Sequence, residues 1–421
     1  METRDLVIIG GGSAGMAAAI SAFDNGVKDI LILEKGEFLG GILNQCIHNG
    51  FGLHEFNEEL TGPEFLTRFV NQIEQRRIEY KLNTYVLSLS QDKTISYVNR
   101  VDGMATIKAK SIIVATGCLE RSAGAIEIPG ERPSGVITAG QAQLYLNEYG
   151  YLVGKKVFIL GSGDIGLIMA RRMTLEGAKV LGVAELMPYS NGLNRNIQQC
   201  LKDFDIPLYL SHTVSKIIGK DKLEAIEVSE VDSSLKVIEG TARRFEVDTL
   251  LLSIGLIPNN ALLNAIGAPQ SKTRGSCVNE HMETSFDGLF ACGNVLHVHD
   301  LVDYVVEEAR VAGLGASKYL KGELIRGEHK ILTEAGEGIG YVVPSQIDLD
   351  EAEDFIELKF RVKRPSKDVY IVYSCDGKII KKVYKSAIIP SEMEIYKLPK
   401  NLLKNNYKAI NVGLEKKEAS K

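Results

Sequence analysis

Short apolar runs that stop on glycine mark out the first three quarters of this chain. Four of these runs end at Gly10, Gly117, Gly161 and Gly255. Uninterrupted apolar runs of four to eight residues are typical of buried strands, and glycine at their ends permits a tight turn. Helix-like segments follow two of the runs. The pattern predicts an α/β fold in which strands and helices alternate.

The first run, residues 7–9, opens a complete strand–turn–helix–strand unit. Gly10 permits the turn out of the strand, Gly12 leaves room for a pyrophosphate, and Gly15 lets helix and strand pack closely. A second apolar strand ends on Glu34, where an acid can bind ribose hydroxyls. The helix N-terminus would face the phosphates. We interpret this unit as a dinucleotide-binding fold rather than a structural turn.

The same unit occurs a second time from residue 157 onward. Gly161, Gly163 and Gly166 repeat the glycine spacing, and Glu185 follows Gly166 by the same number of positions as Glu34 follows Gly15. An internal repeat is more specific than either motif alone. The chain is therefore predicted to bind two dinucleotides.

Other local patterns predict the remaining elements. Thr61 and Glu64 form a capping box before a helix whose apolar residues Phe65, Phe69 and Ile73 recur every four positions. Residues 81–110 read as an antiparallel meander. Residues 302–320 look helical, and Asp300 is expected to be the N-cap of that helix.

Past residue 330 the pattern alternates apolar and polar positions, as in strands with one buried face. Asp376 and Gly377 carry a hairpin signal. The C-terminal segment is therefore predicted to be a separate, small, all-β domain.

Composition limits the class of protein. The 421 residues are 45% hydrophobic and 24% charged, with a net charge of −5. The negative charge argues against nucleic-acid binding. No apolar run is long enough to span a bilayer, and no signal peptide is recognised, so we expect a cytoplasmic protein.

The six cysteines stand apart from one another, with no CxxC pair. Such spacing does not suit zinc or iron–sulfur ligation, so no metal site is expected from them.

Taken together, two dinucleotide units in series, with Ala115-Thr116-Gly117 after the first and residues 288–294 after the second, resemble the two-dinucleotide-binding-domain flavoprotein superfamily. This superfamily includes thioredoxin reductase, lipoamide dehydrogenase and NADH oxidases. The resemblance implies two Rossmann-like three-layer domains, with the NAD domain inserted in the FAD domain. It assigns residues 1–120 and 268–330 to FAD, residues 121–267 to NAD(H), and residues 331–421 to the β-rich domain.

The resemblance also implies the residues that contact each cofactor. Those expected to contact FAD are Gly10, Gly12, Ser13, Ala14, Gly15, Glu34, Lys35, Gly40, Gly41, Ala115, Thr116, Gly117, Gly293 and Asn294. Those expected to contact NAD are Gly161, Gly163, Asp164, Ile165, Gly166 and Glu185. Asn294 stands where the superfamily has an aspartate.

A narrower resemblance lies in residues 115–121, 129–140 and 293–301. These segments are similar to the FAD/NAD subunits of amino-acid and opine dehydrogenases, and to the oxidoreductases associated with glycerol-3-phosphate dehydrogenase-like flavoproteins. That likeness implies a partner flavoprotein subunit. It also leaves room for oligomers formed through the C-terminal domain.

One departure from the superfamily changes the chemistry. Disulfide reductases carry a CxxxxC pair just after Gly40-Gly41, and the two matching positions here are Leu43 and His48. The chain is therefore predicted to be an FAD-dependent, NADH-linked oxidoreductase without a catalytic disulfide. Glu185 favours NADH because its charge would repel the 2′-phosphate of NADPH.

Three further residues are candidates for catalysis. Cys46 suggests an alternative function, a single-cysteine NADH oxidase or peroxidase, and the opposing interpretation is an inert loop thiol. His297 and His299 either hydrogen-bond at the flavin edge or serve packing, with metal ligation less favoured. A non-catalytic nucleotide-binding assembly subunit, or a binding protein without flavin, remains a further alternative.

Overall fold

The computed structural model describes residues 2–324 and 327–417. It divides into two compact units. The first contains the residues up to Asn44, Asn49–Cys118 and everything from Pro258 onward, and the second contains Gln45–His48 and Leu119–Ile257. The second unit thus interrupts the chain of the first, and the predicted α/β fold with an inserted Rossmann-like domain is confirmed. The domain limits expected from the sequence remain a prediction.

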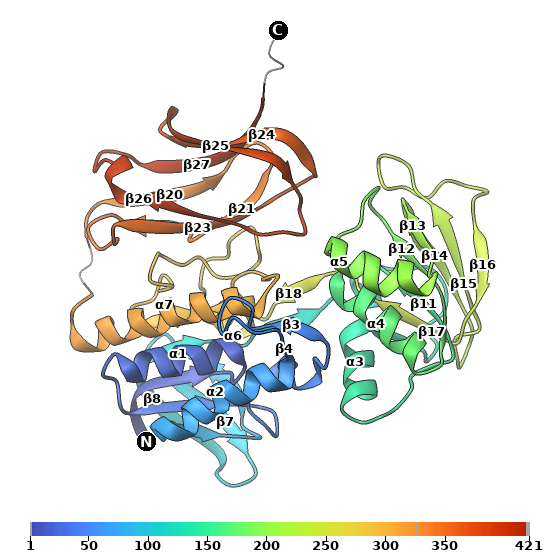
Figure 1. Ribbon diagram of the computed structural model, residues 1–421. Coiled ribbons are helices and arrows are strands. Elements are labelled where there is room, and N and C mark those ends of the chain that lie inside the picture. Colours follow the sequence, from blue (N-terminus) through green and yellow to red (C-terminus); the bar gives the residue numbers. More distant parts are fainter. Residues whose placement is uncertain (1, 325–326, 418–421) are drawn as a thin grey trace. The chain divides into compact units, whose positions relative to one another are not determined.

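The first unit is built on a seven-stranded sheet in the order β5-β2-β1-β8-β7-β6, with β19 paired to β8. Figure 1 labels β7 and β8 of this sheet. Strands β5, β2, β1, β8 and β19 run parallel, and the predicted meander is confirmed as the antiparallel strands β6, β7 and β8. The strands are β1 (Glu2–Ile9), β2 (Ile30–Leu33), β5 (Glu79–Lys81), β6 (Tyr85–Leu89), β7 (Thr94–Asn99), β8 (Gly103–Val114) and β19 (Leu289–Ala291).

Helices of this unit bury their apolar residues against the sheet. They are α1 (Ser13–Asp24), α2 (Gly62–Arg76), the short α6 (Ala261–Ala265) and α7 (Val302–Lys321). The predicted capping box of α2 is present, and Phe65, Phe69 and Ile73 are buried. Two short strands, β3 (Asn49–Phe51) and β4 (Leu60–Thr61), precede α2.

The beginning of α7 differs from the prediction. The N-cap is Leu301, whose side chain cannot cap the helix, so the expectation that Asp300 caps it is wrong. Asp300 instead forms an ion pair with Arg361 and accepts a hydrogen bond from the Met393 backbone N–H. A charged partner elsewhere in the fold outweighs the local cap.

The second unit repeats the architecture around a five-stranded parallel sheet, β10-β17-β11-β12-β13. An antiparallel sheet, β14-β15-β16, accompanies it. The strands are β10 (Val136–Thr138), β11 (Lys156–Leu160), β12 (Lys179–Glu185), β13 (Leu208–Leu210), β14 (His212–Ile218), β15 (Ala225–Glu230), β16 (Arg243–Glu246) and β17 (Thr249–Leu252). The helices are α3 (Ala139–Asn147), α4 (Asp164–Leu175) and the single turn α5 (Asn194–Asn196). The chain passes between the units in β9 (Cys118–Glu120) and β18 (Leu256–Pro258).

The C-terminal part of the first unit is the predicted all-β domain, apart from residues 418–421, which lie outside the described residues. It has a five-stranded sheet, β22-β20-β27-β24-β25, and a three-stranded sheet, β21-β23-β26 (Figure 1). The strands are β20 (Lys330–Ala335), β21 (Ile339–Val343), β22 (Gln346–Asp348), β23 (Phe355–Val362), β24 (Ser366–Cys375), β25 (Lys378–Ile388), β26 (Glu394–Pro399) and β27 (Ala409–Lys416).

This domain has an apolar core of its own, drawn from both sheets. The predicted hairpin is confirmed, since Cys375 pairs with Lys378 and both Asp376 and Gly377 have positive φ. Among the described residues, no helix combines the length and hydropathy needed to cross a bilayer.

Two phenylalanines of β23 provide a test of this core. Phe360 is fully buried, whereas Phe355 is 60% exposed. We expect Phe360→Ala to destabilise the domain by about 3–5 kcal/mol because it removes a buried ring and leaves a cavity. The matched control Phe355→Ala should cost less than about 0.5 kcal/mol. Hydrogen exchange of β23 and β24 peptides measures both, and equal losses in the two variants would contradict the assigned core.

Candidate functional site

The first glycine loop joins β1 to α1. A Cβ on Gly10, whose φ is +108°, would lie 2.4 Å from the Ala115 carbonyl oxygen, and one on Gly15 would lie 1.8 Å from the Gly10 carbonyl oxygen. Only glycine fits these two positions. A Cβ on Gly12 would meet no atom of the described residues within 4 Å. Gly12 therefore borders open space, as expected for a position that a ligand approaches.

The beginning of α1 offers backbone donors to that space. Gly12 is the N-cap, and glycine has no side chain with which to cap the helix. Helices leave their first N–H groups unpaired, and these groups attract anions. Ser13 and Ala14 supply the first of these N–H groups. The arrangement, called the first cradle below, suits a phosphate group.

Other predicted residues gather around the same cradle. Gly40 donates a backbone hydrogen bond to the Gly11 carbonyl at 2.8 Å, and a Cβ on Gly41 would lie 3.5 Å from the Gly12 Cα. Just past the end of β8, Thr116 Oγ1 donates to the Asn259 carbonyl at 2.8 Å. Gly117 has positive φ and, like Gly12, open space beside it.

Glu34 closes the loop from the end of β2. Its Oε2 accepts a hydrogen bond from the Gly11 N–H at 2.6 Å, and its Oε1 accepts one from the Gly36 N–H at 2.7 Å. The carboxylate is buried, whereas Lys35 beside it is exposed. The acid that the sequence assigns to a ribose thus also holds the glycine turn in shape.

The second unit builds the same arrangement. A Cβ on Gly161, with φ of +95°, would lie 2.1 Å from the Ser253 carbonyl oxygen. Ser253 also lines the other two glycines, Gly163 and Gly166. Glu185 is buried and accepts hydrogen bonds from Ser162 N–H at 3.0 Å and from Met187 N–H at 2.9 Å. The two loops therefore share the glycine turn and the buried acid that holds it, but Gly163 is lined by Ser253 where Gly12 borders open space.

The second loop differs in what lies against it. Asp164 Oδ1 accepts hydrogen bonds from Leu193 N–H at 2.9 Å and from Asn196 Nδ2 at 2.6 Å. Ser162 Oγ accepts one from Asn191 N–H at 2.9 Å. Asp164, at the start of α4 before Ile165, thus holds the segment 191–196 against the glycine loop. Sequence reasoning missed this use of Asp164.

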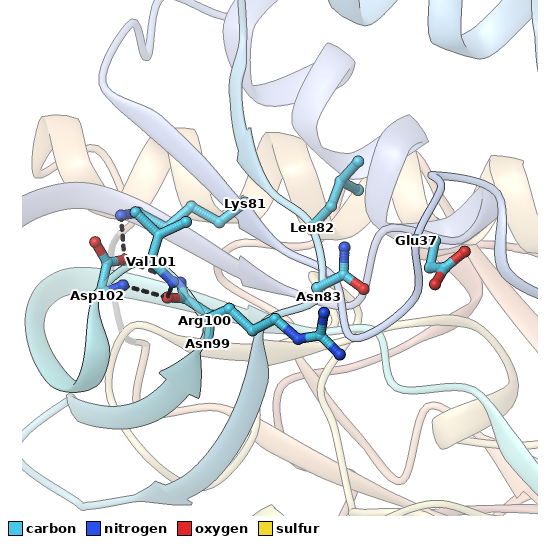
Figure 2. A pocket seen from close by; sticks show the side chains of 8 residues that line it. All are labelled: Glu37, Lys81, Leu82, Asn83, Asn99, Arg100, Val101 and Asp102. Atoms are coloured by element: carbon cyan, nitrogen blue, oxygen red, sulfur yellow. Dashed lines mark hydrogen bonds and ion pairs between the residues drawn. The ribbon is translucent and has the colours of Figure 1, made fainter.

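A hollow of about 380 Å³ lies beside the Glu34 loop in the first unit (Figure 2). Its lining includes Glu37, Asn83 and Arg100, and an ion pair of Lys81 with Asp102 at 2.7 Å. The Lys81 carbonyl accepts the Glu34 backbone N–H at 2.9 Å. The hollow is therefore lined by the strand that pairs with the end of β2, and Glu34 itself is not part of its lining.

The third glycine element follows β19. Gly293 has positive φ, and a Cβ there would lie 2.9 Å from the Ala14 Cβ, so this turn packs against the beginning of α1. Asn294 Oδ1 accepts the His299 backbone N–H at 3.0 Å, and its Nδ2 lies 3.7 Å from Cys118 Sγ. The predicted FAD residues of the first glycine loop, of residues 115–117 and of this turn thus all lie in the first unit.

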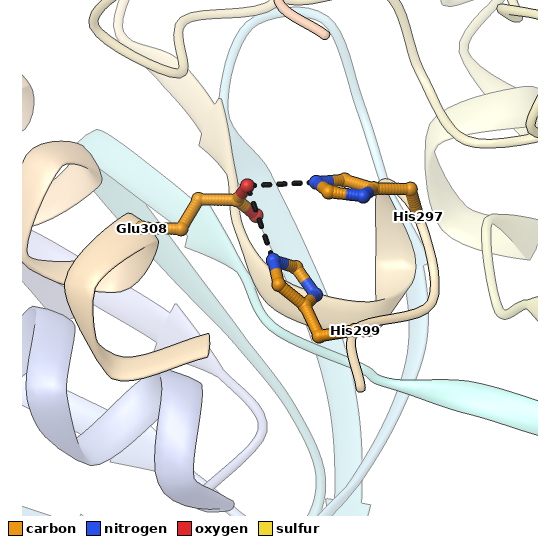
Figure 3. A group of neighbouring side chains, drawn as sticks. All are labelled: His297, His299 and Glu308. Atoms are coloured by element: carbon orange, nitrogen blue, oxygen red, sulfur yellow. Dashed lines mark hydrogen bonds and ion pairs between the residues drawn. The ribbon is translucent and has the colours of Figure 1, made fainter. Parts of the chain in front are cut away.

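His297 and His299 are both buried and lie beside Glu308 of α7 (Figure 3). His297 Nε2 is 2.8 Å and His299 Nε2 is 3.3 Å from Glu308 Oε2. Burial lowers the pKa of His297 to about 4, so this ring is neutral at pH 7. Sequence reasoning did not single out Glu308.

Cys46 lies in the second unit, in the segment 45–48. The thiol is buried, with Sγ 3.9 Å from Gln143 Oε1. Burial raises the pKa of Cys46 to about 12, so the reactive thiolate is scarce at neutral pH. These surroundings do not favour the cysteine-based alternative.

Comparison with known proteins agrees with this geometry. Residues 4–314 match the family model described as pyridine nucleotide-disulphide oxidoreductase. The chain is 26% identical over 394 residues to dihydrolipoyl dehydrogenase 2, mitochondrial, of Arabidopsis thaliana, and this match covers 84% of the chain and 72% of that protein. It is 25% identical to an opine oxidase subunit of Agrobacterium tumefaciens, and this match covers 62% of the chain and 54% of the relative.

The chain spans little more than half the length of several of its relatives, including hydrogen cyanide synthase subunit HcnB of Pseudomonas protegens, at 25% identity. Among solved structures, thioredoxin reductase of T. acidophilum superposes with a TM-score of 0.61 at 22% identity. The match covers 77% of this chain and 99% of that structure, and it shows the fold.

The expected family is thereby confirmed. The chain belongs to the pyridine nucleotide-disulphide oxidoreductase family, whose members use FAD and NAD(P)H.

Proposed function

We propose that this protein is an FAD-dependent, NADH-linked oxidoreductase that works without a catalytic disulfide. The observation that supports the proposal is the pair of glycine turns, each held by a buried acid, Glu34 in one unit and Glu185 in the other. Two cradles of this kind suit two dinucleotides. Leu43 and His48 stand where the disulfide reductases have cysteines.

The residues of the first unit fit FAD. Gly12 and Gly117 border open space, and the uncapped beginning of α1 suits a pyrophosphate. Glu34 and the hollow beside it suit the adenosine half. The turn at Gly293 and Asn294, which packs against Ala14 of α1, suits the ribityl side. When bound, FAD supplies hydride acceptance from the nicotinamide and electron delivery to a second substrate.

The residues of the second unit fit NADH. Both carboxylate oxygens of Glu185 accept hydrogen bonds, one from Ser162 and the other from the Met187 N–H. These bonds hold the carboxylate beside the glycine loop. Leu186, Met187 and Pro188 follow it, without an arginine to pair a 2′-phosphate. A buried carboxylate at this position disfavours the extra phosphate of NADPH by like-charge repulsion.

The electron acceptor is proposed to be a partner flavoprotein or a small molecule. Two relatives are named as subunits, one of opine oxidase and one of hydrogen cyanide synthase, and these names support a partner protein. The NADH oxidase of Methanocaldococcus jannaschii, 26% identical over 338 residues, supports a small acceptor.

Anaerobic titration with NADH tests the proposal. The purified, FAD-loaded protein should lose its flavin absorbance with about one equivalent of NADH, which would exclude a non-catalytic assembly subunit. Cys46→Ser should be reduced at the wild-type rate, because the neutral thiol takes no part. A normal flavin reduction combined with loss of multiple turnover in Cys46→Ser would instead support the single-cysteine alternative.

Gly12→Ala tests the first cradle. The methyl group meets open space and φ is −73°, so the apoprotein should keep its melting temperature within a few degrees. The affinity for FAD should fall at least tenfold, because the methyl occupies space assigned to the pyrophosphate. Gly124→Ala, in an exposed turn, is the control. Unchanged FAD affinity in Gly12→Ala would place the cofactor elsewhere.

Glu185→Gln tests the second cradle and the choice of coenzyme. Removing the charge should raise kcat/KM for NADPH relative to NADH by about tenfold, which corresponds to about 1.4 kcal/mol. The equivalent substitution in the first unit, Glu34→Gln, should weaken FAD binding without changing coenzyme preference. A coenzyme ratio that stays constant in Glu185→Gln would contradict the assignment.

A further inference from the structure

A buried charged cluster joins α7 to the C-terminal β domain within the first unit. The histidines of the cluster come from the segment 297–299 before α7, and Glu308 comes from α7 itself (Figure 3). The β domain contributes Lys359 of β23. The side chains of Glu308 and Lys359 are 0% and 3% exposed. Burying charges is costly unless they are paired, so this cluster needs a physical explanation.

Glu308 is the centre of the cluster. Its Oε1 accepts a hydrogen bond from the Gly293 N–H at 2.9 Å. Its Oε2 accepts one from Lys359 Nζ at 3.1 Å and one from His297 Nε2 at 2.8 Å. Glu308 therefore connects the β domain directly to the turn at Gly293 and Asn294.

The pairing with Lys359 keeps Glu308 ionised. Burial alone would raise the pKa of Glu308, but Lys359, followed by His299 and His297, holds it well below its ordinary value. Burial likewise opposes the charge of Lys359, but Glu308 and Glu357 raise the pKa of that ammonium above its ordinary value. The carboxylate of Glu308 and the ammonium of Lys359 therefore each stabilise the charged form of the other.

The histidines take their orientation from Glu308. His297 is neutral, so its Nε2 carries the proton that it donates to Glu308, and its Nδ1 lies 3.5 Å from the Tyr341 hydroxyl. His299 Nδ1 lies 3.2 Å from Asn294 Oδ1. His299 Nε2 is buried and makes no hydrogen bond to any described residue, although it lies 3.3 Å from Glu308 Oε2.

A metal ion is a poor fit for this cluster. His297, His299 and Glu308 could together offer three ligand atoms, which lie within 4.8 Å of one another. However, the Lys359 ammonium is already 3.1 Å from the same carboxylate oxygen. A cation placed among these ligands would be repelled by that ammonium.

A second contact from the β domain holds the same segment. Arg361 Nη2 donates to the Val298 carbonyl at 3.0 Å and also pairs with Asp300. Arg361 Nε donates to the Tyr341 hydroxyl at 3.2 Å, so the proton of that hydroxyl can point at His297. The β domain thus contacts residues 297–300 through Tyr341 at one end and Arg361 at the other. Lys359 contacts the carboxylate of Glu308, with which His297 is hydrogen-bonded.

We propose that Lys359 is a positioning residue for the cofactor-binding turn at Gly293 and Asn294, acting through the buried carboxylate of Glu308. The inference rests on the proposed function, because it takes this turn to hold FAD. It gives the β domain a part in the cofactor site. Without the ammonium, Glu308 would be an unpaired buried charge and would leave its place beside Gly293 and His297, or retain its charge next to the cofactor.

Lys359→Met and Lys359→Arg test this role. The measurements are reconstitution of the apoprotein with FAD, which gives the dissociation constant, and the midpoint potential of the bound flavin. Lys359→Met should weaken FAD binding at least tenfold and make the midpoint potential more negative, because an unpaired carboxylate opposes electron uptake. Lys359→Arg should restore both values. Lys382→Met, which breaks a surface pair with Glu415 in the same domain, is the control and should match the wild type.

A double variant tests the route through Glu308. Lys359→Met combined with Glu308→Gln removes both fully buried charges, and the carboxylate that then loses its partner is Glu357, whose side chain is 31% exposed. The double variant should therefore recover part of the loss in potential. Where Lys359→Met does not fold, Lys359→Gln takes its place with the same expected outcomes.

Wild-type affinity and potential in the neutral variants, or a loss that Lys359→Arg does not restore, would overturn the role of Lys359. Failure of the wild type to bind FAD, or to be reduced by NADH, would instead overturn the proposed function. The two failures are therefore distinguishable.

Discussion

The hydrogen bond from a glycine-loop N–H to a buried acid at the end of the next strand is the contact on which both units depend. Gly11 donates to Glu34, and Ser162 donates to Glu185. In each unit the acid fixes the turn that begins the following helix. A turn held in this way keeps the uncapped N–H groups of the helix pointing at one place, where an anion can bind. The parallel sheet provides the frame, because its carboxyl edge places the loop and the acid side by side.

The glycines at this edge serve two different physical purposes. Gly10 and Gly15 are required by the protein itself, since any side chain would collide with neighbouring backbone. Gly12 is not, since its Cβ would enter open space. Space that the fold leaves empty beside a helix N-terminus is the physical basis for assigning a ligand to it. Gly10 and Gly15 are therefore needed to form the turn, whereas Gly12 is needed to leave room for the ligand.

The C-terminal β domain has an apolar core of its own, yet its polar residues reach into the other part of the unit. Lys359 and Arg361 alternate with core residues along β23. Lys359 pairs with Glu308 of α7, and Arg361 donates a hydrogen bond to Val298 in the segment before α7. A pair of buried charges adds little stability compared with apolar packing, but its two groups must stay in contact, because separating them leaves an uncompensated buried charge. Such a contact suits a domain that adjusts a site rather than one that merely covers it.

The sequence by itself determined the repeated dinucleotide unit, the capping box of α2, the hairpin at Asp376-Gly377 and the all-β C-terminal domain. Each of these depends on residues close together in the chain, where periodicity, caps and turn chemistry act locally. Only the tertiary structure decided that Asp300 pairs with Arg361 instead of capping α7, that Cys46 is buried, and that Glu308 receives Lys359. Those outcomes depend on residues far apart in the sequence. Burial raises the pKa of Cys46, whereas Lys359 lowers the pKa of Glu308 and keeps it ionised. A single sequence records which groups can ionise, but folding decides which of them meet.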